Sequence, residues 1–194
     1  EGTGYKLNLV DKEIDDSFIK TSISLAKQED FKLRNIKIVY TPLHGSSIVT
    51  IPQVLKKAGH EAVIIVDKQA KPDGDFPTVK SPNPEEPEAL KMAIDIAKVE
   101  DADIVIGTDP DSDRLGVAVK NKKEKYIILN GNQTMLIMAH FLLNKRKEKG
   151  ILSSKDYIAS TIVSSPVMKK VANNFGVKCL TTLTGFKWIG KEIE

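Results

Sequence analysis

Several features are scarce in this 194-residue chain, and each scarcity excludes a class of protein. Cys179 is the only cysteine, which excludes an internal disulfide and a cysteine metal cluster. The longest apolar run, at residues 135–143, is too short to span a membrane and contains His140. The formal net charge is only +3, and the lysines are scattered rather than arranged in a stripe. We therefore expect neither a membrane nor nucleic acid as a partner, and a reducing, cytoplasmic location.

Length and composition limit the organisation of the chain. Hydrophobic residues make up 41% and charged residues 28% of the sequence, as in a soluble globular protein. A length of 194 residues suffices for one large domain, or for one domain and part of another. The first residue is glutamate rather than methionine, so we expect this sequence to be a piece of a longer polypeptide.

Short apolar runs alternate with segments of helical periodicity up to about residue 130. Strands are expected at residues 36–40, 62–66, 102–108, 115–119 and 126–129, and helices at residues 15–27, 48–58 and 87–99. Such alternation is typical of a parallel sheet with covering helices, and the last two strands are expected to pair across a lysine-rich turn. The sequence therefore predicts an α/β fold for residues 1–130: a mixed, mainly parallel sheet with helices on both faces.

A second alternation of helix and strand begins near Gly131. Helices are expected at residues 132–145 and 166–175, and strands at residues 157–163 and 177–181, followed by a helix that is cut off at the chain end. We therefore expect residues 131–194 to be the incomplete start of a second α/β domain.

The most informative segment is the hexapeptide DPDSDR at residues 109–114, which lies between two apolar runs. Ligands of parallel α/β sheets bind at the carboxyl ends of the strands, where this segment is expected. Three carboxylates within five residues repel one another unless a cation neutralises them, and carboxylate oxygens suit Mg²⁺. Asp109, Asp111 and Asp113 are therefore predicted to bind Mg²⁺. Arg114 is predicted to contact phosphate with its planar guanidinium, or else to pair with the aspartates.

An acidic turn and an EF-hand are the local alternatives to a magnesium site. Aspartates are common in solvated turns, but three alternating carboxylates exceed what turn chemistry requires. An EF-hand needs glycine at its sixth position and glutamate at its twelfth, where this chain has Arg114 and Lys120. Asp73 and Asp75 are interpreted as part of a turn, because Gly74 separates them and prolines flank them.

His44 lies in the turn that follows the first expected strand. Ser46 or Ser47 at this place could cap the next helix. A capped turn accounts for the local pattern, so His44 is interpreted as structural.

Several segments, taken in order, resemble the alpha-D-phosphohexomutases, the family of phosphoglucomutase and phosphomannomutase. Residues 109–114 resemble the metal-binding loop of that family, in which alternating aspartates hold magnesium and an arginine follows. Residues 72–77 and 82–85 resemble the loop and helix start upstream of it, and residues 43–45 the first strand-to-helix turn of the same domain. Residues 184–187, TGFK, resemble a loop of the third domain that helps to set the orientation of the sugar.

The resemblance implies an isomerase that acts as an intramolecular phosphotransferase. An enzyme phosphoserine gives its phosphoryl group to a sugar phosphate, and the bisphosphosugar intermediate reorients and returns its other phosphate. The three aspartates would bind Mg²⁺. The residues implied in binding substrate or phosphate are Arg114, Thr184, Gly185 and Lys187.

Members of this family have four domains, and the present chain resembles the second domain and the start of the third. Their phosphoserine lies in a Ser-His-Asn-like loop of the first domain, and that sequence does not occur here. The resemblance therefore implies no catalytic nucleophile in this chain, which we expect to be inactive alone. The expected partners are the sugar phosphate, the bisphosphosugar and the remaining domains of the same polypeptide.

Two other functions stay open at this point. Haloacid-dehalogenase-type phosphatases also place a DxD sequence after a strand and use magnesium. They usually have threonine or valine two places after the second aspartate, where this chain has Asp113. The third function is a non-catalytic module that binds metal and sugar phosphate.

Overall fold

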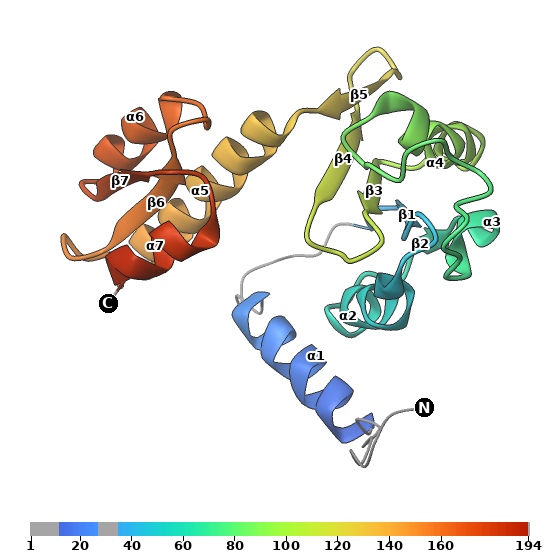
Figure 1. The fold of residues 1–194 in the computed structure, drawn as a ribbon, viewed down its shortest axis with the longest axis horizontal. Helices are drawn as coiled ribbons and strands as arrows, with labels where there is room; N and C mark the ends of the chain where they lie inside the picture. The colour runs from blue at the N-terminus through green and yellow to red at the C-terminus, as the bar shows by residue number, and fades with distance from the viewer. Residues whose placement is uncertain (1–11, 27–34, 194) are drawn as a thin grey trace, which may run out of the picture. The chain divides into compact units, whose positions relative to one another are not determined.

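The computed structural model describes residues 12–26 and 35–193. The chain divides into two compact units, residues 1–128 and 129–194 (Figure 1). The elements up to the boundary are α1 (Lys12–Ala26), β1 (Ile38–Thr41), the 3-10 helix η1 (Ser46–Val49), α2 (Ile51–Lys57), β2 (Val63–Ile65), α3 (Asp67–Ala70), α4 (Pro87–Val99), β3 (Ile104–Thr108), β4 (Leu115–Lys120) and β5 (Tyr126–Leu129).

The first unit is built on a five-stranded sheet in the order β2-β1-β3-β4-β5. β1 runs parallel to both β2 and β3, with Ile38 opposite Val63 on one side and Ile104 on the other. β4 returns antiparallel to β3, with Thr108 opposite Leu115. The sheet is therefore mixed, and the predicted α/β class is confirmed. The DPDSDR segment forms the connection between β3 and β4.

Both faces of this sheet are covered, and successive residues of β1 show how. Val39 belongs to one core cluster with Val105 of β3 and Leu90 of α4. The next side chain, Tyr40, points to the opposite face, where its hydroxyl donates a hydrogen bond to Ser47 Oγ in η1 at 2.6 Å. α4 thus covers one face at this point, and η1 covers the other.

Two glycines lie where α4 and the chain at Pro84 pack against the sheet. Gly107 and Gly116 are opposite each other in the β3–β4 pair. A Cβ atom on Gly116 would lie 2.1 Å from the carbonyl oxygen of Pro84, and one on Gly107 would lie 2.5 Å from Leu90 Cδ2. Pro84 is fully buried. The close approach of Pro84 therefore requires a residue without a side chain at position 116, whereas a side chain at position 107 would meet Leu90 of α4.

We expect Gly116→Ala to lower the free energy of unfolding of the first unit by about 1–3 kcal/mol, the usual range for overpacking. The added methyl group would meet backbone atoms of Pro84, which cannot rotate away. Urea unfolding measures the loss. Gly74→Ala is the matched control, because nothing lies within 4 Å of a Cβ atom at that position. Equal stability of Gly116→Ala and the control would contradict the close approach.

The second unit contains a small parallel pair of strands with helices. Its elements are α5 (Gly131–Glu148), β6 (Tyr157–Thr161), α6 (Val167–Asn174), β7 (Lys178–Thr182) and α7 (Phe186–Ile193). α5 begins with a capping box, in which the Asn130 side chain accepts from Gln133 N at 2.9 Å and Asn130 N donates to Gln133 Oε1 at 3.0 Å. The core of the unit is formed by Leu143, Ala172 and Val177.

Two elements differ from the sequence-based expectation. The helix expected at residues 48–58 starts as the 3-10 helix η1 and breaks at Thr50 before α2 begins. Pro52 has no backbone N–H to donate, so it is accommodated in the first turn of a new helix and not inside a continuous one. The long polar loop after β2 contains the short helix α3, which was not predicted. Within the described ranges, no helix combines the length and hydrophobicity that a membrane crossing requires.

Candidate metal and phosphate site

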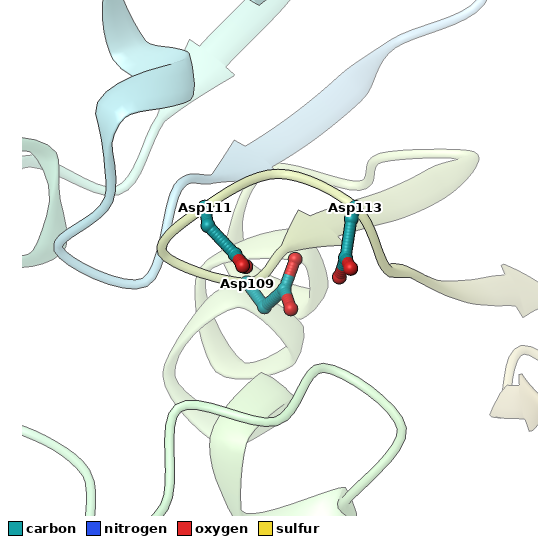
Figure 2. A group of neighbouring side chains, drawn as sticks. All are labelled: Asp109, Asp111 and Asp113. Atoms are coloured by element: carbon teal, nitrogen blue, oxygen red, sulfur yellow. The ribbon is translucent and has the colours of Figure 1, made fainter. Parts of the chain in front are cut away.

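The structure brings Asp109, Asp111 and Asp113 together on the connection between β3 and β4. One carboxylate oxygen from each residue lies within 4.8 Å of the others. Figure 2 shows the side chains of Asp111 and Asp113 extending from the loop toward the Asp109 carboxylate. Asp109 is buried, whereas Asp111 and Asp113 are exposed. The cluster therefore combines one carboxylate fixed in the protein with two that face solvent.

Arg114 holds the buried carboxylate in place. Its backbone N–H donates to Asp109 Oδ1 at 2.9 Å, and its Nε donates to Asp109 Oδ2 at 2.6 Å. Burial raises the pKa of the Asp109 carboxyl, but the two hydrogen bonds and the charge of Arg114 outweigh it, so that this pKa lies below its ordinary value. Asp109 is therefore ionised at neutral pH and fixed in orientation.

The two predicted roles of Arg114 are compatible. The ion pair with an aspartate exists, and Nε also lies 3.8 Å from Asp113 Oδ1. Both contacts use Nε, while a guanidinium carries five N–H donors. The Arg114 side chain is 50% exposed. It can therefore keep its bond to Asp109 and still offer donors to a phosphate group.

Repulsion within the cluster raises the pKa of its third carboxylate, Asp113. The charge of Asp111 raises the pKa of Asp113, and the hydrogen bond and charge of Asp109 raise it further. With all groups ionised, three carboxylates and one guanidinium carry two negative charges in total. A divalent cation would neutralise this charge and relieve the repulsion.

We call residues 109–114 the carboxylate loop. A turn that follows β1, distant from it in sequence, packs against this loop. Ser46 donates twice to the carbonyl oxygen of Pro110, from its backbone N–H at 3.0 Å and from Oγ at 3.2 Å. A Cβ atom on Gly45 would lie 2.4 Å from Pro110 Cα. Inside the loop, Ser112 has a φ of +67° and its N–H donates to the Asp109 carbonyl oxygen at 3.0 Å. The loop backbone is therefore held from both outside and inside.

Sequence reasoning missed three buried hydroxyl groups beside Asp109. Ser47 Oγ lies 2.6 Å from Tyr40 Oη and 2.7 Å from Thr108 Oγ1, and the latter two atoms are 3.1 Å apart. Burial raises the pKa of Tyr40, and its hydrogen bonds do not offset this effect. Because Thr108 directly precedes Asp109, these hydroxyls fix the end of β3 against η1. Single serine and threonine residues give no signal that would have predicted the cluster.

The other predicted binding residues belong to the second unit: Thr184 and Gly185 lie in the connection from β7 to α7, and Lys187 lies in the first turn of α7. Gly185 has a φ of +114°, and its carbonyl oxygen accepts from Trp188 N at 3.1 Å. Lys187 Nζ lies 5.3 Å from the centroid of the Trp188 ring. All three residues are exposed. Their joint action with the aspartates on one substrate stays a prediction.

Comparison with known families matches nearly the whole chain. Residues 16–123 match alpha/beta/alpha domain II of phosphoglucomutase/phosphomannomutase, and residues 130–194 match alpha/beta/alpha domain III. The two matched segments follow each other in the same order as the two units of the structure.

Individual relatives agree with these matches. A probable phosphomannomutase of Haemophilus influenzae is 37% identical over 183 residues, which are 94% of this chain and 36% of the relative. A phosphoglucomutase of Staphylococcus aureus is 38% identical over 160 residues, 82% of this chain and 28% of that protein. The solved structure of Aspergillus fumigatus N-acetylphosphoglucosamine mutase, in complex with GlcNAc-6P and magnesium, has a similar fold, with a TM-score of 0.63 at 14% identity over 92% of this chain and 34% of that one. The chain thus spans about a third of the length of these proteins and belongs to the phosphoglucomutase/phosphomannomutase family, of which it comprises domains II and III.

Proposed function

We propose that this chain is the metal-binding and part of the sugar-binding portion of a magnesium-dependent sugar phosphomutase. The observation that supports this most directly is the convergence of three carboxylates within 4.8 Å on the domain II loop. The Aspergillus fumigatus relative binds magnesium and a hexosamine phosphate. The relatives include both phosphoglucomutases and phosphomannomutases, so we propose α-D-hexose phosphates as the substrate class.

The donor set fits Mg²⁺. All three donors are carboxylate oxygens, the hard ligands that this ion takes, and two of them face solvent, where water or phosphate oxygens can complete an octahedron. Both oxygens of Asp109 accept from Arg114, but each carboxylate oxygen retains a second lone pair for a metal. Bound Mg²⁺ would supply Lewis-acid stabilisation of the charge on a transferring phosphoryl group.

The protein residues contribute orientation and charge. Arg114 keeps Asp109 ionised, and its half-exposed guanidinium offers further donors to a phosphate group. Lys187 adds a positive charge, and Gly185 leaves room for a sugar close to the backbone. Phosphoryl transfer depends mainly on positioning and electrostatic stabilisation, which these residues provide. In this proposal the phosphoserine and the second phosphate site are supplied by the remaining domains of the polypeptide.

Membership of the mutase family removes the phosphatase interpretation. The haloacid-dehalogenase alternative requires Asp109 to act as a nucleophile. In the structure both oxygens of that carboxylate accept hydrogen bonds from Arg114, which lowers their nucleophilicity. A non-catalytic metal and sugar-phosphate module remains a fair description of these 194 residues taken by themselves.

Binding of Mn²⁺, as a spectroscopic substitute for Mg²⁺, tests the metal site through its pH dependence. Because the pKa of Asp113 is raised, its carboxylate takes up a proton at a higher pH than an ordinary aspartate as the pH falls. We therefore expect Mn²⁺ affinity, followed by electron paramagnetic resonance, to be constant near neutrality and to fall on acidification, starting above the ordinary aspartate range. Asp109, whose pKa is lowered, stays ionised throughout that step.

Asp113→Asn is the control for this assignment. Without the titrating carboxylate, the affinity should be lower at neutral pH and nearly independent of pH in the same interval. A chain that binds no Mn²⁺ at any pH would overturn the proposed metal site. An unchanged pH profile in Asp113→Asn would remove Asp113 from it.

A further inference from the structure

His44 is almost completely engaged by one distant segment of the chain, residues 69–78. Its backbone N–H donates to the carbonyl oxygen of Gln69 at 2.9 Å, and its own carbonyl oxygen accepts from Asp73 N at 3.1 Å. Its Nδ1 lies 3.2 Å from the carbonyl oxygen of Lys71, and its Nε2 lies 2.9 Å from Thr78 Oγ1. The residue is only 5% exposed. All four of its polar groups thus bind a segment that begins 25 residues downstream.

The directions of these hydrogen bonds form a consistent chain. A carbonyl oxygen can only accept, so in the neutral ring Nδ1 carries the proton and Nε2 accepts from the Thr78 hydroxyl. Thr78 Oγ1 in turn accepts from Gln69 Nε2 at 3.0 Å, and Gln69 Oε1 accepts from Thr41 Oγ1 at 2.7 Å. Each of these side chains makes hydrogen bonds to its neighbours in a partly buried network, which makes the geometry well defined.

The backbone at His44 is strained. Leu43 and His44 have φ values of +45° and +62°, in the left-handed region that residues other than glycine adopt infrequently. Such conformations cost about 1–3 kcal/mol each and persist where the surroundings enforce them. The four bonds of His44 to residues 69–78 provide that enforcement.

The next two residues, Gly45 and Ser46, contact the carboxylate loop directly. We call residues 42–46 the brace turn, which is closed by a bond from Gly45 N to the Pro42 carbonyl oxygen at 2.8 Å. Gly45 approaches Pro110 so closely that a Cβ atom would lie 2.4 Å from its Cα and 2.7 Å from its oxygen. Ser46 donates two hydrogen bonds to that same oxygen. Pro110 separates the first two aspartates of the cluster.

We infer that His44 and Gly45 are positioning residues for the carboxylate loop. His44 holds the brace turn in its left-handed conformation, and through Gly45 and Ser46 the turn fixes Pro110, so that the carboxylates of Asp109 and Asp111 converge. Neither residue contacts the metal or the substrate in this scheme. The inference rests on the proposed metal-binding function of the loop, and it assigns to His44 a role that the sequence interpretation as a structural histidine did not include.

Two substitutions in the full 194-residue chain test this. Gly45→Ala is compatible with the local φ of −100°, so its effect comes from the contacts of the added methyl group with Pro110 and with the Pro42 carbonyl oxygen, which closes the brace turn. His44→Asn tolerates a positive φ but is too short to keep both ring contacts. We expect each to weaken Mn²⁺ binding about 10–100-fold, the usual effect of outer-shell partners of a metal site. Without metal, each should shift the backbone amide resonances of Asp109 and of residues 111–114 while those of α4 stay in place.

The controls separate positioning from a general loss of stability. Gly74→Ala adds the same methyl group where nothing lies within 4 Å, and His60→Asn makes the same exchange at another histidine of the first unit. Both should bind Mn²⁺ like the wild type. All measurements are made well below the unfolding temperature of each variant. If Gly45→Ala does not fold, Ser46→Ala, which removes only the Oγ bond to Pro110, replaces it with a smaller expected loss.

The possible results distinguish this inference from the proposed function. Wild-type Mn²⁺ affinity and unshifted amides of the carboxylate loop in His44→Asn and Gly45→Ala would overturn the positioning role and leave the metal site intact. If the wild type binds no Mn²⁺, the proposed function fails, and the amide shifts alone decide whether the brace turn sets the loop conformation. A loss of affinity with shifts confined to the loop supports both.

Discussion

Asp111→Asn is expected to weaken Mn²⁺ binding by at least about 100-fold, the largest effect of any single substitution considered. The substitution keeps the shape of the side chain and removes one of three negative charges in a cluster whose ligand atoms lie within 4.8 Å of one another. Attraction between a carboxylate and a dication that it binds amounts to several kcal/mol at the effective dielectric constant of about 20 that applies near a protein surface, and each 1.4 kcal/mol corresponds to tenfold in affinity. Titration with Mn²⁺, followed by electron paramagnetic resonance, measures the change.

Asp73→Asn is the matched control for this experiment. It removes the same charge from the same unit, at a residue whose Oδ1 accepts from Asp75 N at 3.0 Å in a local turn. Its Mn²⁺ affinity should stay within about twofold of the wild type, because asparagine keeps the Oδ1 acceptor of this turn and the residue is not part of the carboxylate cluster. Equal losses in Asp73→Asn and Asp111→Asn would mean that the ion responds to net charge and has no specific site at the loop. An unaffected Asp111→Asn would remove Asp111 from the proposed ligand set.

The candidate metal cluster was predictable because its signal is local. Three aspartates alternate within five residues, and the apolar runs on both sides had the length and composition of strands, which the structure contains as β3 and β4. α4 was predicted with its observed bounds, Pro87–Val99, because Pro87 favours a first helical turn and the apolar residues that follow have helical spacing. Features of this kind depend on residues that are neighbours in the sequence, so they can be predicted from it.

The support of the loop could not be predicted, because it joins residues that are far apart in sequence. Ser46 Oγ donates to a carbonyl oxygen 64 residues away, and Tyr40 lies beside a hydroxyl group 68 residues away. The sequence suggested that Ser46 or Ser47 caps a helix. In the structure Ser46 instead donates to Pro110 of the carboxylate loop, and Ser47 belongs to the hydroxyl cluster with Tyr40 and Thr108. Only the parallel alignment of β1 and β3 brings these groups together. The contacts of His44 could not be predicted for the same reason, since its hydrogen-bond partners lie on a separate loop, at residues 69–78.

The 194-residue chain by itself is expected to show no conversion of glucose 1-phosphate to glucose 6-phosphate, with Mg²⁺ and glucose 1,6-bisphosphate present. The reaction of the family needs a phosphoserine as donor and acceptor, and no Ser-His-Asn sequence occurs in this chain. The chain offers the three carboxylates of the proposed metal site, and Arg114 for charge stabilisation. Positioning and electrostatic stabilisation give little catalysis when the reacting group is missing. In a well-studied hydrolase, loss of the nucleophile alone lowers kcat about 10⁶-fold.

The decisive comparison is between the wild-type chain and Asp111→Asn, purified in parallel from the same host. A contaminating host mutase would give both preparations the same residual rate, whereas turnover by this chain would fall in the variant, which lacks one carboxylate of the proposed metal site. A rate that is present in the wild type and reduced in Asp111→Asn would show that the chain contains its own phosphoryl acceptor. The serines and threonines near the cluster, Ser46 and Ser112 first because both lie at the surface of the loop region, would then be the candidates for it. Equal background rates in both preparations would agree with a nucleophile that another domain of the polypeptide provides.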